Sequence, residues 1–114
     1  MGLTSALKSL FSKGPERTIS FDDLNREATA GTVAVVDVRE PPEFASGHVP
    51  GAINMPLSRF NPGQLPTGKP VVLICLAGGR SGRALGQAVA AGRTDVVHYP
   101  GGMNGWRQAG GKIV

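Results

Sequence analysis

The chain has very little cysteine and no long hydrophobic run. Cys75 is its only cysteine among 114 residues, so an internal disulfide is impossible. No apolar stretch approaches the ~20 residues that a membrane-spanning helix needs, and no hydrophobic region of a secretory signal is visible. Hydrophobic residues still make up 40%, enough for a globular core. These features predict one globular domain in a reducing, cytoplasmic setting.

The sequence also lacks a concentration of charge and is poor in aromatic residues. Its 12 basic and 8 acidic residues give a formal charge of +4, and the basic residues are scattered. Aromatic residues account for only 5%. This composition argues against nucleic-acid binding and suits a small anionic substrate better.

Short strand-like and helix-like segments alternate along the chain. Such alternation is typical of a three-layer α/β/α fold with a central, mainly parallel sheet of about five short strands. In these sheets, ligands bind at the carboxyl ends of the strands. The predicted strands are 18–20, 32–38, 51–56, 71–75 and 95–100, and the predicted helices are 21–30, about 41–48, 81–91 and a short one after 100.

Residues 1–14 are predicted to form an amphipathic helical extension ahead of a domain that spans residues 15–114. Leucine and phenylalanine recur there at helical spacing, and Gly14-Pro15 ends the pattern. The apolar stripe needs a cover, either this domain or a second copy of it. Membrane binding is less favoured because the polar face is not strongly basic.

The stretch VVLICLAGGRS places Cys75 at the end of the most strand-like segment, where a glycine loop leads into a helix. Gly78 and Gly79 permit positive φ, so several N–H groups can converge on one point. The helix N-terminus and Arg80 add positive charge. A thiol in such a cradle ionises readily, and the thiolate is the nucleophile. The alternative is that Cys75 is a small buried hydrophobe that closes the strand.

Three stretches, in order, resemble landmarks of the rhodanese-like sulfurtransferases. VVDVREPPEFASGHVPGAINMPL (35–57) is similar to the family's Asp-x-Arg and Gly-His-x-Pro-Gly-Ala region. CLAGGRS (75–81) resembles its active-site loop, and YPGGMNGWRQAG (99–110) resembles its C-terminal signature. The likeness extends from about residue 18 to residue 110.

The resemblance implies covalent sulfur transfer. Cys75 would accept a sulfane sulfur from a small anionic donor such as thiosulfate, and the persulfide would pass it to cyanide or a thiol. It implies no metal and no organic cofactor. The residues that would bind the donor and the persulfide are Leu76, Ala77, Gly78, Gly79, Arg80 and Ser81.

Two other functions stay open. The domain could be a persulfide carrier or a binding module for a dedicated sulfur-relay partner, although binding-only relatives often lack the cysteine. It could also be a cysteine-dependent phosphatase or arsenate reductase of the same fold. Those enzymes place one residue more between cysteine and arginine than the four that separate Cys75 from Arg80.

Several polar residues are expected to support the site rather than react. Asp37 and Arg39, at the end of a predicted strand, could line the pocket, but pairing with neighbours, either Glu43 or the backbone, to brace the loop around Cys75 is favoured. His48 would tie down its own loop, and His98 would carry no chemistry. Trp106 would fill the core or form a pocket wall.

The short spacing between Cys75 and Arg80 predicts negligible phosphatase activity, because a shorter loop suits a single sulfur atom rather than a phosphate. We expect p-nitrophenyl phosphate to be hydrolysed far more slowly than sulfur is transferred. Hydrolysis that depends on Cys75 and matches the rate of sulfur transfer would contradict this assignment.

Overall fold

A parallel sheet of four short strands forms the centre of the computed structural model, which describes residues 17–114. The strand order is β2-β1-β3-β4, and every pairing is parallel. The helical extension predicted for residues 1–14 lies outside the described residues. The strands are β1 (Ala34–Asp37), β2 (Ile53–Asn54), β3 (Val71–Ile74) and β4 (Val96–His98).

The predicted parallel α/β architecture is confirmed, with one difference at the first strand. Thr18 pairs with His98 only through an isolated parallel bridge, so 18–20 adds a single residue to the edge of β4. The chain leaves the sheet at once because Ser20 caps the next helix and accepts a hydrogen bond from the Asp23 N–H.

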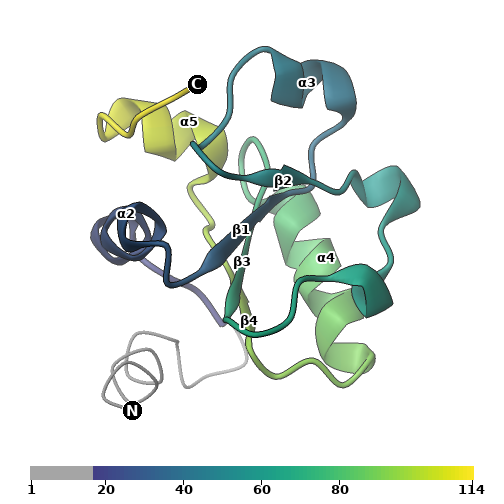
Figure 1. Cartoon of the computed structure of the whole chain (residues 1–114). Helices are drawn as coiled ribbons and strands as arrows, with labels where there is room; N and C mark the ends of the chain where they lie inside the picture. The colour runs from purple at the N-terminus through teal and green to yellow at the C-terminus, as the bar shows by residue number, and fades with distance from the viewer. Residues whose placement is uncertain (1–16) are drawn as a thin grey trace.

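Helices cover both faces of the sheet (Figure 1). Helices α2 (Phe21–Ala30) and α5 (Gly102–Gln108) lie on one face. Helix α4 (Gly79–Ala90) and the 3₁₀ turns η1 (Leu57–Arg59) and η2 (Pro62–Gln64) lie on the other. The short helix α3 (Pro41–Ala45) stands beyond the carboxyl end of β1, the edge at which ligands are expected.

Strand β3 is the centre of the molecule. All four of its residues are buried, and it pairs with β1 on one side and β4 on the other. A strand covered on both faces reads as a continuous apolar run, which explains why VVLI was the clearest strand in the sequence. The residue that follows it, Cys75, therefore begins the loop from inside the core.

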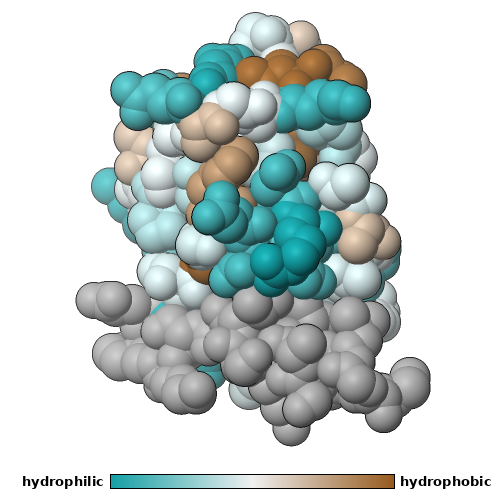
Figure 2. All heavy atoms as spheres, turned by 90° about the vertical axis from the view of Figure 1, so that its left-hand side faces the viewer, coloured by the Kyte–Doolittle hydropathy of each residue, from teal (hydrophilic) through white to brown (hydrophobic). Residues whose placement is uncertain are grey.

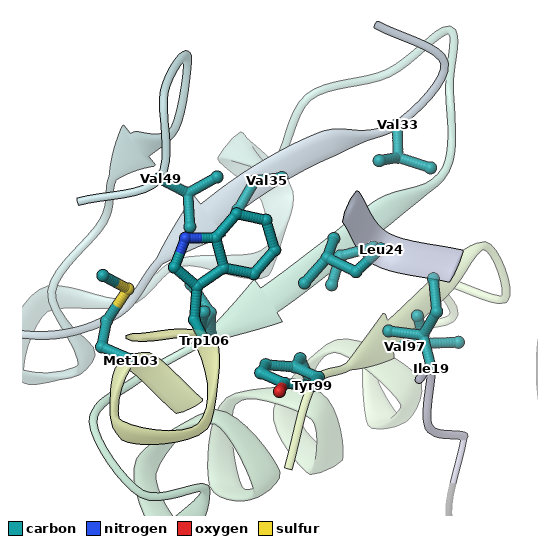
Figure 3. Packing of buried hydrophobic residues seen from close by; sticks show 11 residues of the cluster. Ile19, Leu24, Val33, Val35, Val49, Val97, Tyr99, Met103 and Trp106 are labelled. Carbon is teal, nitrogen blue, oxygen red and sulfur yellow. The ribbon is translucent and has the colours of Figure 1, made fainter. Parts of the chain in front are cut away.

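Trp106 fills the core between the sheet and the α2–α5 layer, as predicted. Its ring is 1% exposed and lies among Val35, Val49 and Met103 (Figure 3). Its indole N–H donates to the Lys112 carbonyl at 2.9 Å, so burial of the ring leaves no polar atom without a partner. The indole thus ties the C-terminal segment to α5.

The outer face of α2 and α5 carries a cluster of hydrophilic side chains beside a smaller group of apolar ones, and a further apolar patch lies at its upper edge (Figure 2). Among residues 17–114, the large hydrophobic residues that are exposed are few: Ile53, Val89, Ile113 and Val114. Within the described part of the chain, no helix has both the length and the apolar character needed to cross a bilayer.

Two glycines make a matched pair for testing how tightly the fold holds the cysteine loop. Gly102 has φ +63°, and an added Cβ would collide with the Leu76 carbonyl. We expect Gly102→Ala to lower the free energy of unfolding by about 1–3 kcal/mol. Gly86 lies in α4 with open space around it, so Gly86→Ala should raise stability by up to ~1 kcal/mol. Urea denaturation measures the free energy of unfolding of each variant. Equal changes in the two variants would contradict the close approach of Gly102 to the Leu76 carbonyl.

Candidate active site

Cys75 lies at the carboxyl end of β3, and its backbone fixes the loop that follows. The residue is only 1% exposed and packs in the cluster between the sheet and α4. Its carbonyl accepts a hydrogen bond of 2.8 Å from the Met103 N–H, and the Leu76 carbonyl accepts one of 3.1 Å from Asn104. Because the start of α5 holds these two carbonyls, the loop cannot move independently of that helix.

The loop turns sharply at Gly78, which brings it back over the sulfur. Gly78 has φ +101° and is the N-cap of α4. A Cβ there would strike the carbonyl of Pro100, so only glycine fits between the loop and the turn that precedes α5. Helix α4 consequently begins at Gly79, two residues earlier than the sequence predicted.

The sulfur of Cys75 accepts several hydrogen bonds from this loop. The Gly78 N–H lies 3.1 Å from Sγ and the Ser81 N–H lies 3.3 Å from it. In the thiol form, the S–H group of Cys75 in turn donates to the Ser81 hydroxyl oxygen at 3.5 Å. Burial alone would raise the pKa of the thiol, but the hydrogen bonds from Ser81, Gly78 and Ala77 outweigh it and lower the pKa below its ordinary value. The cradle therefore favours a thiolate.

The predicted loop residues divide into those that touch the sulfur and those that do not. Gly78 and Ser81 donate to Sγ, and the Ala77 backbone also lowers the pKa of the thiol, whereas Leu76 is partly buried against the α2–α5 core. Ala77 and Gly79 are exposed on the outer side of the loop. The tip of the loop thus presents apolar or bare backbone surface, and it carries no charged side chain.

Arg80 forms a bidentate ion pair with Glu43 of α3. The two N–O distances are 2.7 and 2.9 Å. The guanidinium holds the pKa of the Glu43 carboxyl down at about 2, and the carboxylate raises the pKa of Arg80. An anion that enters the cradle therefore meets a neutral pair at this position rather than a free arginine.

Asp37 and Arg39 form a second, fully buried ion pair beneath α3. Arg39 donates from Nε and from its terminal nitrogen to both carboxylate oxygens, with a shortest distance of 2.7 Å, and also donates to the Gly47 carbonyl at 2.8 Å. Asn54 donates to both backbone carbonyls of the pair. The predicted pairing with neighbours thus runs through backbone groups of the α3 region, whereas Glu43, the other partner considered, pairs with Arg80.

His48 and His98, the two histidines, have different surroundings. His48 stacks on Phe44 and its Nδ1 lies 2.8 Å from the Phe44 carbonyl, so it ties down its own loop. His98 ends β4, and its Nδ1 lies 2.9 Å from the Ser81 hydroxyl. From the sequence, no chemistry was expected of His98, and the structure places this strand residue in contact with Ser81 of the cysteine loop. The place of His98 at the carboxyl end of the strand next to β3 was the signal in the sequence.

A metal centre does not form from the side chains of residues 17–114. No group of three or more histidine, cysteine, aspartate or glutamate residues is arranged there to hold a metal ion. What the site does offer is one nucleophile, a ring of N–H donors and a helix N-terminus directed at the sulfur.

The family model of the rhodanese-like domain matches residues 20–109. The chain belongs to the rhodanese-like domain family. The match includes both glycine turns of the site, both ion pairs and His98. It therefore covers the whole arrangement around Cys75.

Relatives of this rhodanese-like domain include proteins named as sulfurtransferases. The thiosulfate:glutathione sulfurtransferase of Saccharomyces cerevisiae is 33% identical over 113 residues, covering 83% of this chain and 81% of the relative. An uncharacterized protein of Synechocystis sp. is 45% identical over 95 residues, or 82% of this chain. The chain spans only 53% of the length of that cyanobacterial relative.

Solved structures agree with the rhodanese-like fold. A rhodanese-related protein of Thermoplasma volcanium superimposes with a TM-score of 0.77 at 32% sequence identity. The alignment covers 86% of this chain and 97% of the other. The likeness shows that the four-stranded sheet and its helices form a rhodanese-like domain.

The Glu43–Arg80 pair predicts a specific dependence of stability on pH. Since folding lowers the pKa of Glu43 from 4.5 to about 2, its contribution to stability is present above pH 4.5 and is lost as the pH falls toward 2. We expect Glu43→Gln to be less stable than the native chain at pH 6, and the difference to shrink through this acidic range.

The effect should be modest, because the side chains of Arg80 and Glu43 are 29% and 34% exposed and solvent screens the pair. Thermal unfolding at a series of pH values measures it. A difference between the two proteins that stays constant from pH 6 to pH 2 would contradict the ion pair.

Proposed function

We propose that this rhodanese-like domain is a sulfurtransferase that carries a sulfane sulfur as a persulfide on Cys75. One observation supports this most strongly: a nearly buried sulfur receives hydrogen bonds from the Gly78 and Ser81 amides at the start of α4. Such donors stabilise an anionic sulfur where water cannot. The sulfurtransferase names among its relatives point to the same reaction class.

The proposed reaction has two displacement steps at sulfur. The Cys75 thiolate attacks the outer sulfur of thiosulfate and forms an S–S bond, while the bond to the sulfonate sulfur breaks and its electron pair leaves with sulfite. Cyanide or a thiolate then attacks the outer sulfur of the persulfide. That step breaks the S–S bond to Cys75 and restores the thiolate, so no external oxidant or reductant is consumed.

The charges around the cradle bear on the donor and the acceptor. Arg80 is neutralised by Glu43, and Leu76 and Ala77 carry no charge. A small anionic donor would therefore be held mainly by backbone N–H groups and the α4 terminus. A thiol is our preferred acceptor, in line with the thiosulfate:glutathione name of the yeast relative.

A persulfide carrier for a dedicated protein partner is the second candidate. Ala77 and Gly79 expose the rim of the loop, where a partner's thiol could approach the outer sulfur. This candidate differs from the enzyme in one measurable respect. A carrier would be loaded by a partner protein and would react slowly with free thiosulfate.

Thiosulfate treatment should add one sulfur atom to the protein, and dithiothreitol should remove it. The adduct forms on Cys75, because this is the single cysteine of the chain. We expect Cys75→Ser to lose both the adduct in intact-mass measurements and thiocyanate formation from cyanide. A serine variant that keeps either activity would refute the mechanism. Loading by a sulfur-relay protein but not by thiosulfate would favour the carrier.

A further inference from the structure

A continuous chain of hydrogen bonds joins Cys75 to His98. Sγ of Cys75 lies 3.5 Å from the Ser81 hydroxyl, and that hydroxyl lies 2.9 Å from Nδ1 of His98. The sulfur is almost completely buried, whereas His98 is partly exposed. The three side chains therefore connect a buried nucleophile with the surface through groups that can all donate and accept a proton.

We propose that His98 is a proton-relay and positioning residue that acts on Cys75 through Ser81. The inference deepens the proposed function and rests on it in one respect, that the thiolate is the working nucleophile. Backbone amides can stabilise a thiolate, but they cannot carry its proton away. Ser81 and His98 supply that path.

The relay balances proton by proton. In the thiol state, S–H donates to the Ser81 oxygen, and the hydroxyl donates to Nδ1 of an imidazole protonated on Nε2. Ionisation passes the sulfur proton to the serine oxygen, the hydroxyl proton to Nδ1 and the Nε2 proton to water. The thiolate then accepts from Ser81, which accepts from Nδ1–H. Serine and imidazole end neutral, and one proton has left.

His98 also affects how strongly Ser81 donates to the sulfur. The hydroxyl has one proton, and the Gly78 carbonyl at 3.2 Å is a competing acceptor. When Nδ1–H donates to the serine oxygen, the hydroxyl becomes polarised and donates more strongly to the thiolate. Loss of the imidazole should therefore raise the pKa of Cys75 as well as remove the path for its proton.

The surroundings of His98 favour a neutral ring. Burial lowers the pKa of His98 below its ordinary value. None of the charged or titratable groups described near His98 hydrogen-bonds its ring. Arg80 and Asp95 are held in ion pairs, with Glu43 and Arg93 respectively. Arg17 donates to the Thr94 carbonyl, Arg83 is exposed on α4, and Tyr99 is the next residue along the chain. A neutral ring passes a proton on to water instead of retaining it.

The rate at which iodoacetamide alkylates Cys75, followed against pH, tests the positioning role of His98 without any sulfur donor, because the midpoint reports how strongly Ser81 stabilises the thiolate. We expect His98→Phe to raise the midpoint of this profile by about one pH unit, which slows alkylation about tenfold below the midpoint. His98→Asn should recover most of that shift, because its amide still hydrogen-bonds to Ser81. His48→Asn is the matched control and should keep the native midpoint.

Nitrogen-15 NMR of the native chain provides a test that needs no variant. We expect the His98 ring to change from the Nε2–H to the Nδ1–H tautomer as Cys75 ionises. The proposal is overturned if the tautomer stays the same, or if folded His98→Phe keeps the native midpoint. If the variants show the expected alkylation midpoints but the native chain transfers no sulfur, the proposed function is refuted and the role of His98 is still supported.

Discussion

The structure around Cys75 depends on one constraint: a thiol that is almost completely buried can ionise only if hydrogen-bond donors surround its sulfur. Burial opposes ionisation of Cys75, so hydrogen-bond donors must replace the missing water. The loop provides them only because Gly78 turns back at φ +101° and α4 begins immediately afterwards. Met103 and Asn104 of α5 then hold the loop carbonyls, so the cradle is set by the packing of two helices on β3.

The sequence was sufficient to predict the parts of the fold that depend on local patterns. The continuous apolar run of β3 and the bounds of α2 were both predicted correctly. The fifth strand was not, because the length of a strand depends on partners across the sheet. The sequence around Thr18 favours a strand, but Thr18 pairs with only one residue, His98, before Ser20 caps α2.

The candidate site was predictable wherever neighbours in sequence create it, and unpredictable wherever the fold brings distant residues together. The segment from Cys75 to Ser81 is contiguous, so its geometry follows from glycine and a helix start. The partners of Arg80 and Ser81 lie 37 and 17 residues away. Choosing Glu43 for Arg80, and His98 for Ser81, requires knowing how α3 and β4 sit against α4.

The sulfur is held by backbone amides and one serine. The side chains at the tip of the loop, Leu76 and Ala77, can therefore change without altering the groups that hold it. The side chain of Ala77 points to solvent-accessible surface and contributes to the sulfur only through its N–H. Lysine or arginine introduced there would change which anions approach, without disturbing the groups that hold the sulfur. A substitution at this single exposed position would therefore alter the electrostatic surroundings of Cys75 and leave the hydrogen bonds to its sulfur in place.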